Sequence, residues 1–201
     1  MHFDDNPGCI VKFIGATTRT EFVGTESKNE ITTILLFELV EGGDLLKYIF
    51  NGARPFPEPL ALFITRSLII GIDYAHSKGV SLLDIKPDNI LFCGKLDLSN
   101  WKYWVKQCDC GLSKLSEGPF NSFQGTRDYM SPQVLFSKTY YGEESDLFSL
   151  AVCIFMMVVG RRPFFRANPY NLPNIRNLEQ DSDYVLLVTG QHMLFWSNFE
   201  A

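Results

Sequence analysis

Two short segments carry polar residues at a spacing that can do chemistry. Residues 84–89 read Asp-Ile-Lys-Pro-Asp-Asn, and Asp109-Cys-Gly follows twenty positions after the Asn. In this layout Asp84 can orient an attacking hydroxyl, and Lys86 can neutralise a transferring phosphoryl group. Asn89 and Asp109 carry the oxygen ligands that Mg²⁺ prefers. Together these residues favour a phosphoryl-transfer site.

Taken one at a time, the same residues have simpler explanations. An Asp such as Asp84, close before a Pro, commonly caps a turn, and an Asn such as Asn89 commonly supplies a turn amide. A single Lys such as Lys86 is commonly a solvated surface residue. The spacing, rather than any one residue, indicates the site.

Three further segments surround these two in a fixed order: Leu35–Leu45, Gly125–Gln133 and Ser145–Phe164. With Asp84–Leu91 and Asp109–Gly111, they resemble a eukaryotic-type Ser/Thr protein kinase. In chain order, the five are similar to the hinge strand, the catalytic loop, the Mg²⁺-binding loop, the substrate-positioning loop and the central helix of the larger lobe. The Lys-Pro pair after the catalytic acid is typical of the Ser/Thr form.

The resemblance implies an α+β, protein-kinase-like fold with a mainly helical C-terminal lobe. We expect residues 1–40 to be a remnant of the N-terminal β-lobe and residues 41–201 to be a C-terminal lobe that is incomplete at its end. It also implies ATP and Mg²⁺ as cofactors, with transfer of the γ-phosphate to Ser or Thr of a protein substrate. A regulatory protein partner is a further expectation.

A nucleotide site at the hinge follows from the same resemblance. Glu38 and Val40 would offer backbone groups to adenine, Phe37 would limit the depth of the pocket, and Leu91 would form its apolar floor. Taken singly, these apolar residues are equally well explained as a strand packing into a core.

The second loop departs from the family pattern at one position. Asp109 would face the nucleotide and bind Mg²⁺ together with Asn89, and Gly111 would give the backbone its freedom. Cys110 stands where the family has Phe, so we expect looser packing between the lobes and an unchanged metal ligand.

Three other departures concern regulation and packing. The family's His-Arg before the catalytic acid reads Leu82-Leu83, and that Arg pairs with a phosphorylated residue at a position that falls on Ser122. We therefore expect phosphorylation of Ser122 not to activate the protein through the usual ion pair. Gln133 replaces a Glu whose Arg partner is also not found, which avoids a lone buried charge.

The sequence contains no Gly-x-Gly-x-x-Gly and no recognisable Lys–Glu pair before the hinge, so the nucleotide would lack its upper cover. Three functions stay open. The chain can be an incomplete copy of an active Ser/Thr kinase, or a pseudokinase that acts as an interaction scaffold. A kinase for small molecules is disfavoured because Gly125–Gln133 resembles a peptide-positioning loop.

Composition narrows the class of protein. The chain has 201 residues, 46% of them hydrophobic, a net charge of −5 and a pI of about 5.2. This balance argues against a general binder of nucleic acid or anionic membranes. Five cysteines without a disulfide spacing, and no signal peptide, favour a reducing, cytoplasmic location. The longest apolar run, Leu147–Val159, is shorter than the roughly 20 residues of a membrane span.

Periodicity and punctuation place the secondary structure. Two strands with an exposed polar connection, and three helices, are expected. Asp44 is expected to cap the first helix, Asp146 the third, and Gly160 to end the third. The expected ranges are strands Ile10–Gly15 and Thr33–Leu39, and helices Leu45–Phe50, Pro59–Ser77 and Leu147–Val159.

Overall fold

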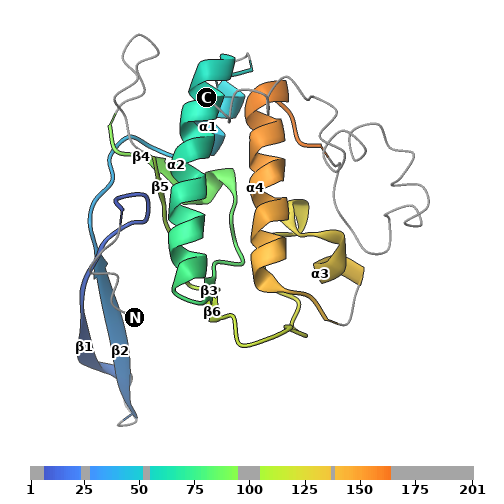
Figure 1. The fold of residues 1–201 in the computed structure, drawn as a ribbon. Coiled ribbons are helices and arrows are strands. Elements are labelled where there is room, and N and C mark those ends of the chain that lie inside the picture. Colours follow the sequence, from blue (N-terminus) through green and yellow to red (C-terminus); the bar gives the residue numbers. More distant parts are fainter. Residues whose placement is uncertain (1–6, 24–27, 52–54, 95–104, 137–138, 164–201) are drawn as a thin grey trace.

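The computed structural model describes residues 7–23, 28–51, 55–94, 105–136 and 139–163. Within these ranges the strands form small two-stranded sheets, and the two longer helices lie side by side (Figure 1). This is the α+β arrangement expected from the sequence. The expected end of the large lobe, residues 164–201, lies outside the described residues.

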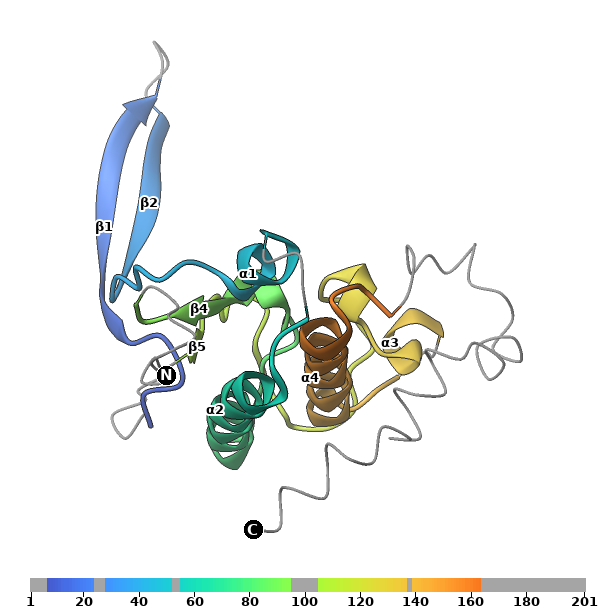
Figure 2. The ribbon, with the colours of Figure 1, turned by 90° about the horizontal axis from the view of Figure 1, so that it is seen from above.

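Two long helices form the body of the described structure. Helix α2 (Glu58–Ser77) and helix α4 (Gly142–Val159) pack side by side, and the short helix α1 (Leu45–Asn51) lies near one end of them (Figure 1, Figure 2). Helix α2 buries an apolar face that includes Ile64, Leu68 and Ile72. These positions follow the helical period, which is why α2 matches its predicted range closely. Helix α1 also matches its predicted range.

Helix α4 begins earlier than predicted. It starts at Gly142, and Glu143 and Glu144 lie in its first turn, where carboxylates stabilise the helix dipole. The prediction that Asp146 caps the helix was wrong, because this residue lies within the helix and is fully buried. Gly160 ends the helix at a φ of 78°, as expected. No helix in the described ranges is long and apolar enough to cross a membrane.

An antiparallel hairpin precedes the helices. Strand β1 (Phe13–Val23) pairs with β2 (Lys28–Phe37), so the predicted pairing is confirmed but both predicted ranges need correction. Much of the segment predicted as an exposed connection belongs to the strands, because its Thr residues suit a pleated backbone. Ile10 lies before β1 and forms an isolated bridge with Gln107.

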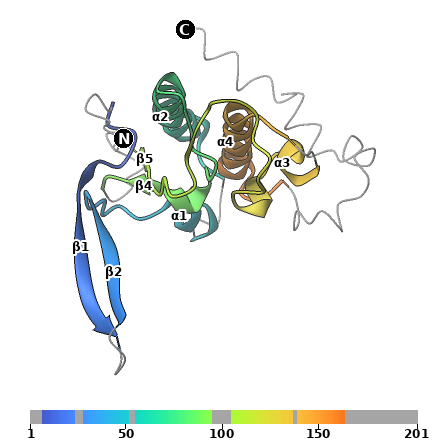
Figure 3. The ribbon, with the colours of Figure 1, turned by 90° about the horizontal axis from the view of Figure 1, so that it is seen from below.

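The hairpin projects from the body, as three views agree (Figure 1, Figure 2, Figure 3). Large apolar side chains on it are exposed, among them Ile14 at 63% and Leu35 at 55%. Cross-strand register places Leu35 on one face and its neighbours Ile34 and Leu36 on the other, so both faces carry apolar groups.

Four short strands hold the loops between the helices. Strand β3 (Val80–Ser81) pairs with β6 (Lys114–Leu115), and β4 (Ile90–Phe92) pairs with β5 (Val105–Gln107). The segment from β3 to β4 contains the 3₁₀ turn η1 (Pro87–Asn89). Further along, the 3₁₀ turn η2 (Arg127–Tyr129) leads into the short helix α3 (Pro132–Phe136). The polar residues singled out in the sequence lie on these connections.

Candidate active site

The backbone before Asp84 is fixed by one buried carboxylate. Asp146 accepts hydrogen bonds from the backbone N–H groups of Leu82 and Leu83, each at 2.7 Å, and lies 2.9 Å from His76 Nε2. A fully buried carboxylate needs such partners, and here two of them are consecutive amides of the loop. Helix α4 therefore holds the start of the loop through a single side chain.

Leu83 occupies the position where the family carries an Arg. Its φ of 64° is uncommon for a residue other than Gly, and its backbone is held by the bond to Asp146. The side chain is buried in a small apolar cluster with Met130, Val134 and Tyr140. The position thus serves packing and carries no charge.

Asp84 is the centre of a compact polar network. The residue is 8% exposed, and its carboxylate accepts hydrogen bonds from Thr126 Oγ1 at 2.7 Å and from Lys86 Nζ at 2.7 Å. Lys86 Nζ also donates to Thr126 Oγ1 at 3.0 Å. The three groups orient one another, so the carboxylate is held in one position.

Asn89 completes the loop from within the turn η1. Its Nδ2 donates to the backbone carbonyl of Asp84 at 3.0 Å and to the Asp84 carboxylate at 3.1 Å. Because the amide nitrogen is used in this way, the side-chain carbonyl oxygen stays available as a ligand. The structure therefore brings together Asp84, Lys86 and Asn89 as the sequence predicted.

A backbone bond joins the second loop to the first. Cys108 N–H donates to the carbonyl of Asn89 at 2.8 Å, which places Asp109 directly after the junction. Asp109 is exposed, has a φ of 56° and accepts the N–H of Gly111 at 3.2 Å. Such strained backbone at a polar residue is common at functional sites.

The donor set suits a hard cation. Asn89 offers an amide oxygen and Asp109 a carboxylate, and Mg²⁺ is typically held by one or two protein groups together with phosphate oxygens. Among the described residues there is no cluster of three or more His, Cys, Asp or Glu that could hold a metal alone. The two loops thus fit Mg²⁺ bound with a phosphate ligand.

Thiols beside this site are poor nucleophiles. Burial, reinforced by the charge of Asp109, raises the pKa of Cys108 to about 11. Burial also raises the pKa of Cys110. All five cysteines are free, and these two stay protonated at neutral pH. Cys108 is half-buried, whereas the residue Cys110 is exposed and does not pack in the core.

The hinge runs along strand β4. Gly42 N–H donates to the Phe92 carbonyl at 2.8 Å, and Phe92 N–H donates to the Gly43 carbonyl at 2.9 Å. The half-buried Val40 and Leu91 lie on these two adjacent segments, as a shared nucleotide site requires. Among the described residues, none pairs with the Val40 N–H.

Phe37 and Glu38 stand where the hairpin joins the hinge. The ring of Phe37 is half exposed and meets the ring of Phe13 edge to face at 5.6 Å. Glu38 Oε1 accepts hydrogen bonds from Lys106 Nζ at 2.6 Å and from the Lys12 N–H at 2.7 Å. Burial acts to raise the pKa of Glu38, but these bonds and the nearby cations together lower it. The side chain of Glu38 therefore holds the hairpin to β5, while its carbonyl stays open among the described residues.

Sequence reasoning missed several members of the site. Thr126 contacts both Asp84 and Lys86. Its position directly after Gly125, in the segment Gly125–Gln133, could have indicated this role. Lys114 Nζ donates to Ser122 Oγ at 2.9 Å, a contact across a loop that spacing alone does not reveal.

A family model described as the protein kinase domain matches residues 8–196. CBL-interacting protein kinase 26 of Oryza sativa subsp. japonica is 38% identical over 147 residues, which cover 71% of this chain and 28% of the relative. The cAMP-dependent protein kinase catalytic subunit PRKX of Homo sapiens is 36% identical over 138 residues, 69% of this chain and 36% of the relative.

Serine/threonine-protein kinase ppk21 of Schizosaccharomyces pombe is 31% identical over 165 residues, 77% of this chain and 28% of the relative. The matched region thus spans about a third or less of these relatives. With the matched model and the assembled loops, the chain belongs to the eukaryotic-type Ser/Thr protein kinase family.

Proposed function

We propose that this chain carries the acceptor side of a Ser/Thr protein kinase, where the γ-phosphate of ATP passes to a protein hydroxyl. The observation that carries the proposal is the bonded set of Asp84, Lys86, Thr126 and Asn89. In this set a nearly buried carboxylate, a Lys, a Thr and an Asn from two separate loops are bonded to one another, as a preorganised transfer site requires.

In this reaction Asp84 orients the acceptor hydroxyl and accepts its proton as the oxygen attacks phosphorus. Lys86, 2.7 Å from the carboxylate, stabilises the negative charge that builds on the transferring group. Thr126 holds both side chains in place, so that the carboxylate needs no reorganisation when the hydroxyl arrives.

The cofactor residues follow from the same loops. Val40 N–H and the Glu38 carbonyl would meet adenine, Phe37 would bound the pocket and Leu91 would lie beneath the base. Asn89 and Asp109 would hold Mg²⁺, which supplies charge neutralisation at the phosphates. General use of ATP and Mg²⁺ in the protein kinase family supports this assignment.

The test compares the parent chain with Asp84→Asn and Asp109→Asn in assays of Mg²⁺-ATP binding and of phosphate transfer to a Ser/Thr protein acceptor. Asp84→Asn should abolish transfer with near-normal nucleotide binding, and Asp109→Asn should weaken Mg²⁺-ATP binding. Asp73→Asn, an exposed change on α2, is the matched control. Transfer at the parental rate in both site variants would refute the assignment.

We also propose that phosphorylation of Ser122 does not act through the usual Arg pair. Leu83 is buried where that Arg would stand, and Lys114 is the cation beside the Ser122 hydroxyl. A many-fold rise in activity after stoichiometric phosphorylation of Ser122 would contradict this proposal.

A cytoplasmic location and a regulatory protein partner complete the proposal. Five free thiols support the location, since disulfides are rare in reducing compartments. Relatives named for interaction with CBL support the partner. Location of a tagged chain in cells, and purification of its complexes, test the two points.

A further inference from the structure

Beyond the proposed transfer reaction, on which this inference rests, we infer that Arg127 selects acceptor peptides with a carboxylate side chain directly beside the acceptor residue. Arg127 belongs to the turn η2 and follows Thr126, whose hydroxyl bonds the Asp84 carboxylate at 2.7 Å. Successive Cα atoms are about 3.8 Å apart in both chains, and an Arg side chain is longer than this spacing, so it can reach the residue next to the acceptor.

The guanidinium of Arg127 has no carboxylate partner among the described residues. Its side chain is exposed and lies against the ring of Phe123, with Cζ 5.6 Å from the ring centroid. An Arg over an aromatic face keeps its charge and its donors while its rotamers are restricted. It is therefore positioned to bind an incoming carboxylate in bidentate fashion.

Two charged groups near Arg127 in the described part of the chain already have partners. Lys86 is bonded to Asp84, and Asp128 forms an ion pair with Arg162 at 3.3 Å. Among the described residues, Arg127 thus carries a positive charge without a carboxylate partner, one residue after the Thr that bonds Asp84. Asp88, exposed on η1, is an opposing charge that favours a Lys peptide over a Glu peptide, and it is the same in every variant.

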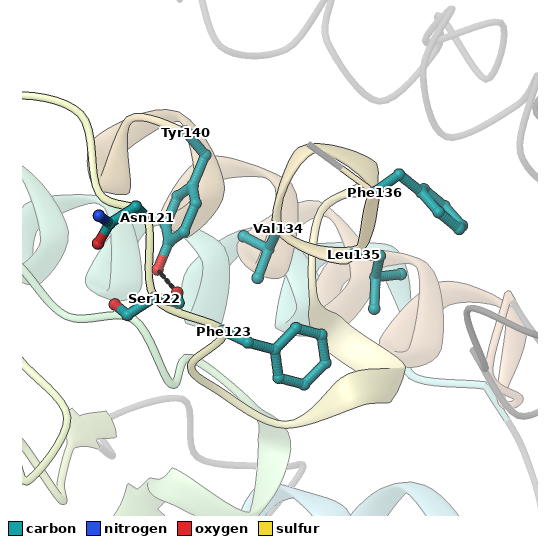
Figure 4. Close-up of a pocket in the computed structure, with 7 residues that line it drawn as sticks. All are labelled: Asn121, Ser122, Phe123, Val134, Leu135, Phe136 and Tyr140. Carbon is teal, nitrogen blue, oxygen red and sulfur yellow. Dashed lines mark hydrogen bonds between the residues drawn. The ribbon is translucent and has the colours of Figure 1, made fainter. Parts of the chain in front are cut away.

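The described residues that line the cavity beside Phe123 include no acid. A cavity of about 420 Å³ opens there between the segment before η2 and helix α3, and Figure 4 shows that the Phe123 ring forms one of its sides. None of its lining residues carries a carboxylate, and Lys114 bonds Ser122 at its edge. The lining residues are Asn121, Ser122, Phe123, Val134, Leu135, Phe136 and Tyr140.

The test measures binding of labelled peptides by fluorescence anisotropy at low ionic strength, with the purified 201-residue chain. Each peptide holds one Ser between two Glu, two Gln or two Lys residues. Because Asp88 favours the Lys peptide in every variant, the readout is the change in the ratio of the Lys-peptide Kd to the Glu-peptide Kd. Arg127→Glu should lower this ratio at least fivefold or so, as expected for exposed charge pairs near 1 kcal/mol.

Two further variants keep the result interpretable. Arg127→Gln removes the charge at similar length and should give about half of the effect on a logarithmic scale, which protects the test if the Glu variant folds poorly. Arg66→Glu makes the same charge change at an exposed position on α2 and should leave the ratio unchanged.

The inference is overturned if the Kd ratio of both Arg127→Glu and Arg127→Gln stays within about twofold of the parental ratio. It is also overturned if none of the peptides binds. Phosphate transfer to the same peptides is measured in parallel. A changed ratio without transfer supports the selecting role of Arg127 and refutes the kinase proposal, whereas transfer with an unchanged ratio refutes this inference alone.

Discussion

Asp146 is expected to be one of the costliest positions in the chain to alter. Asp146→Asn keeps the size of the side chain but leaves one carbonyl oxygen where two carboxylate oxygens accept the N–H groups of Leu82 and Leu83. The side-chain NH₂ of the new Asn then faces one of these backbone N–H groups, and two donors oppose each other. Hydrogen bonds to a charged group contribute about 1.5–3 kcal/mol each, and an unsatisfied buried donor costs about 1–3 kcal/mol.

We therefore expect Asp146→Asn to lower the free energy of unfolding by about 3 kcal/mol, a large part of the roughly 5–15 kcal/mol of a typical domain. Urea unfolding followed by circular dichroism measures the change, with a midpoint shift of about 1–3 M if the slope is unchanged. Asp73→Asn, on the exposed face of α2, should stay within about 0.5 kcal/mol. A loss below about 0.5 kcal/mol in Asp146→Asn would show that the carboxylate does not hold the loop.

Three smaller effects are expected. The pKa of Glu38 is lowered in the folded protein, so its carboxylate stabilises the fold at pH values above its ordinary pKa of 4.5. Glu38→Gln should therefore cost about 0.5 kcal/mol at neutral pH and nothing in acid. Equal losses at both pH values would contradict this. The rate of alkylation of Cys108, measured by peptide mass spectrometry, should keep rising with pH up to the pKa of about 11. A plateau near pH 9 would contradict the raised pKa of this thiol. Gly42→Ala would place a methyl against the Phe92 carbonyl and should cost about 1–3 kcal/mol in urea unfolding, whereas Gly15→Ala, which meets open space, is the control.

The sequence predicts the local order of this chain well where one short segment decides the outcome. Helix α2 follows from its apolar period and from Lys78-Gly79 after it. The loop of Asp84, Lys86 and Asn89 is similarly local, since its members lie within six positions of one another. Such features need no knowledge of the rest of the fold.

Contacts between distant segments were not predictable in this way. Asp146 lies more than sixty positions from the amides it binds, and a helix-capping Asp has the same local sequence as a buried one. Thr126 and Lys114 likewise gain their roles from segments that meet only after folding. The strand ends were misjudged because polar Thr residues suit a connection and an exposed strand equally well.

The projecting hairpin has a consequence for the order in which the native protein opens. Strands β1 and β2 bond chiefly to each other, and a two-stranded hairpin is at best marginally stable by itself. Its amide protons should therefore exchange with solvent through local opening, well before those of α2 and α4. The Glu38–Lys106 ion pair and the Lys12 N–H bond mark where that opening stops. We therefore expect the hairpin to open as a separate cooperative unit that ends where β2 meets the hinge.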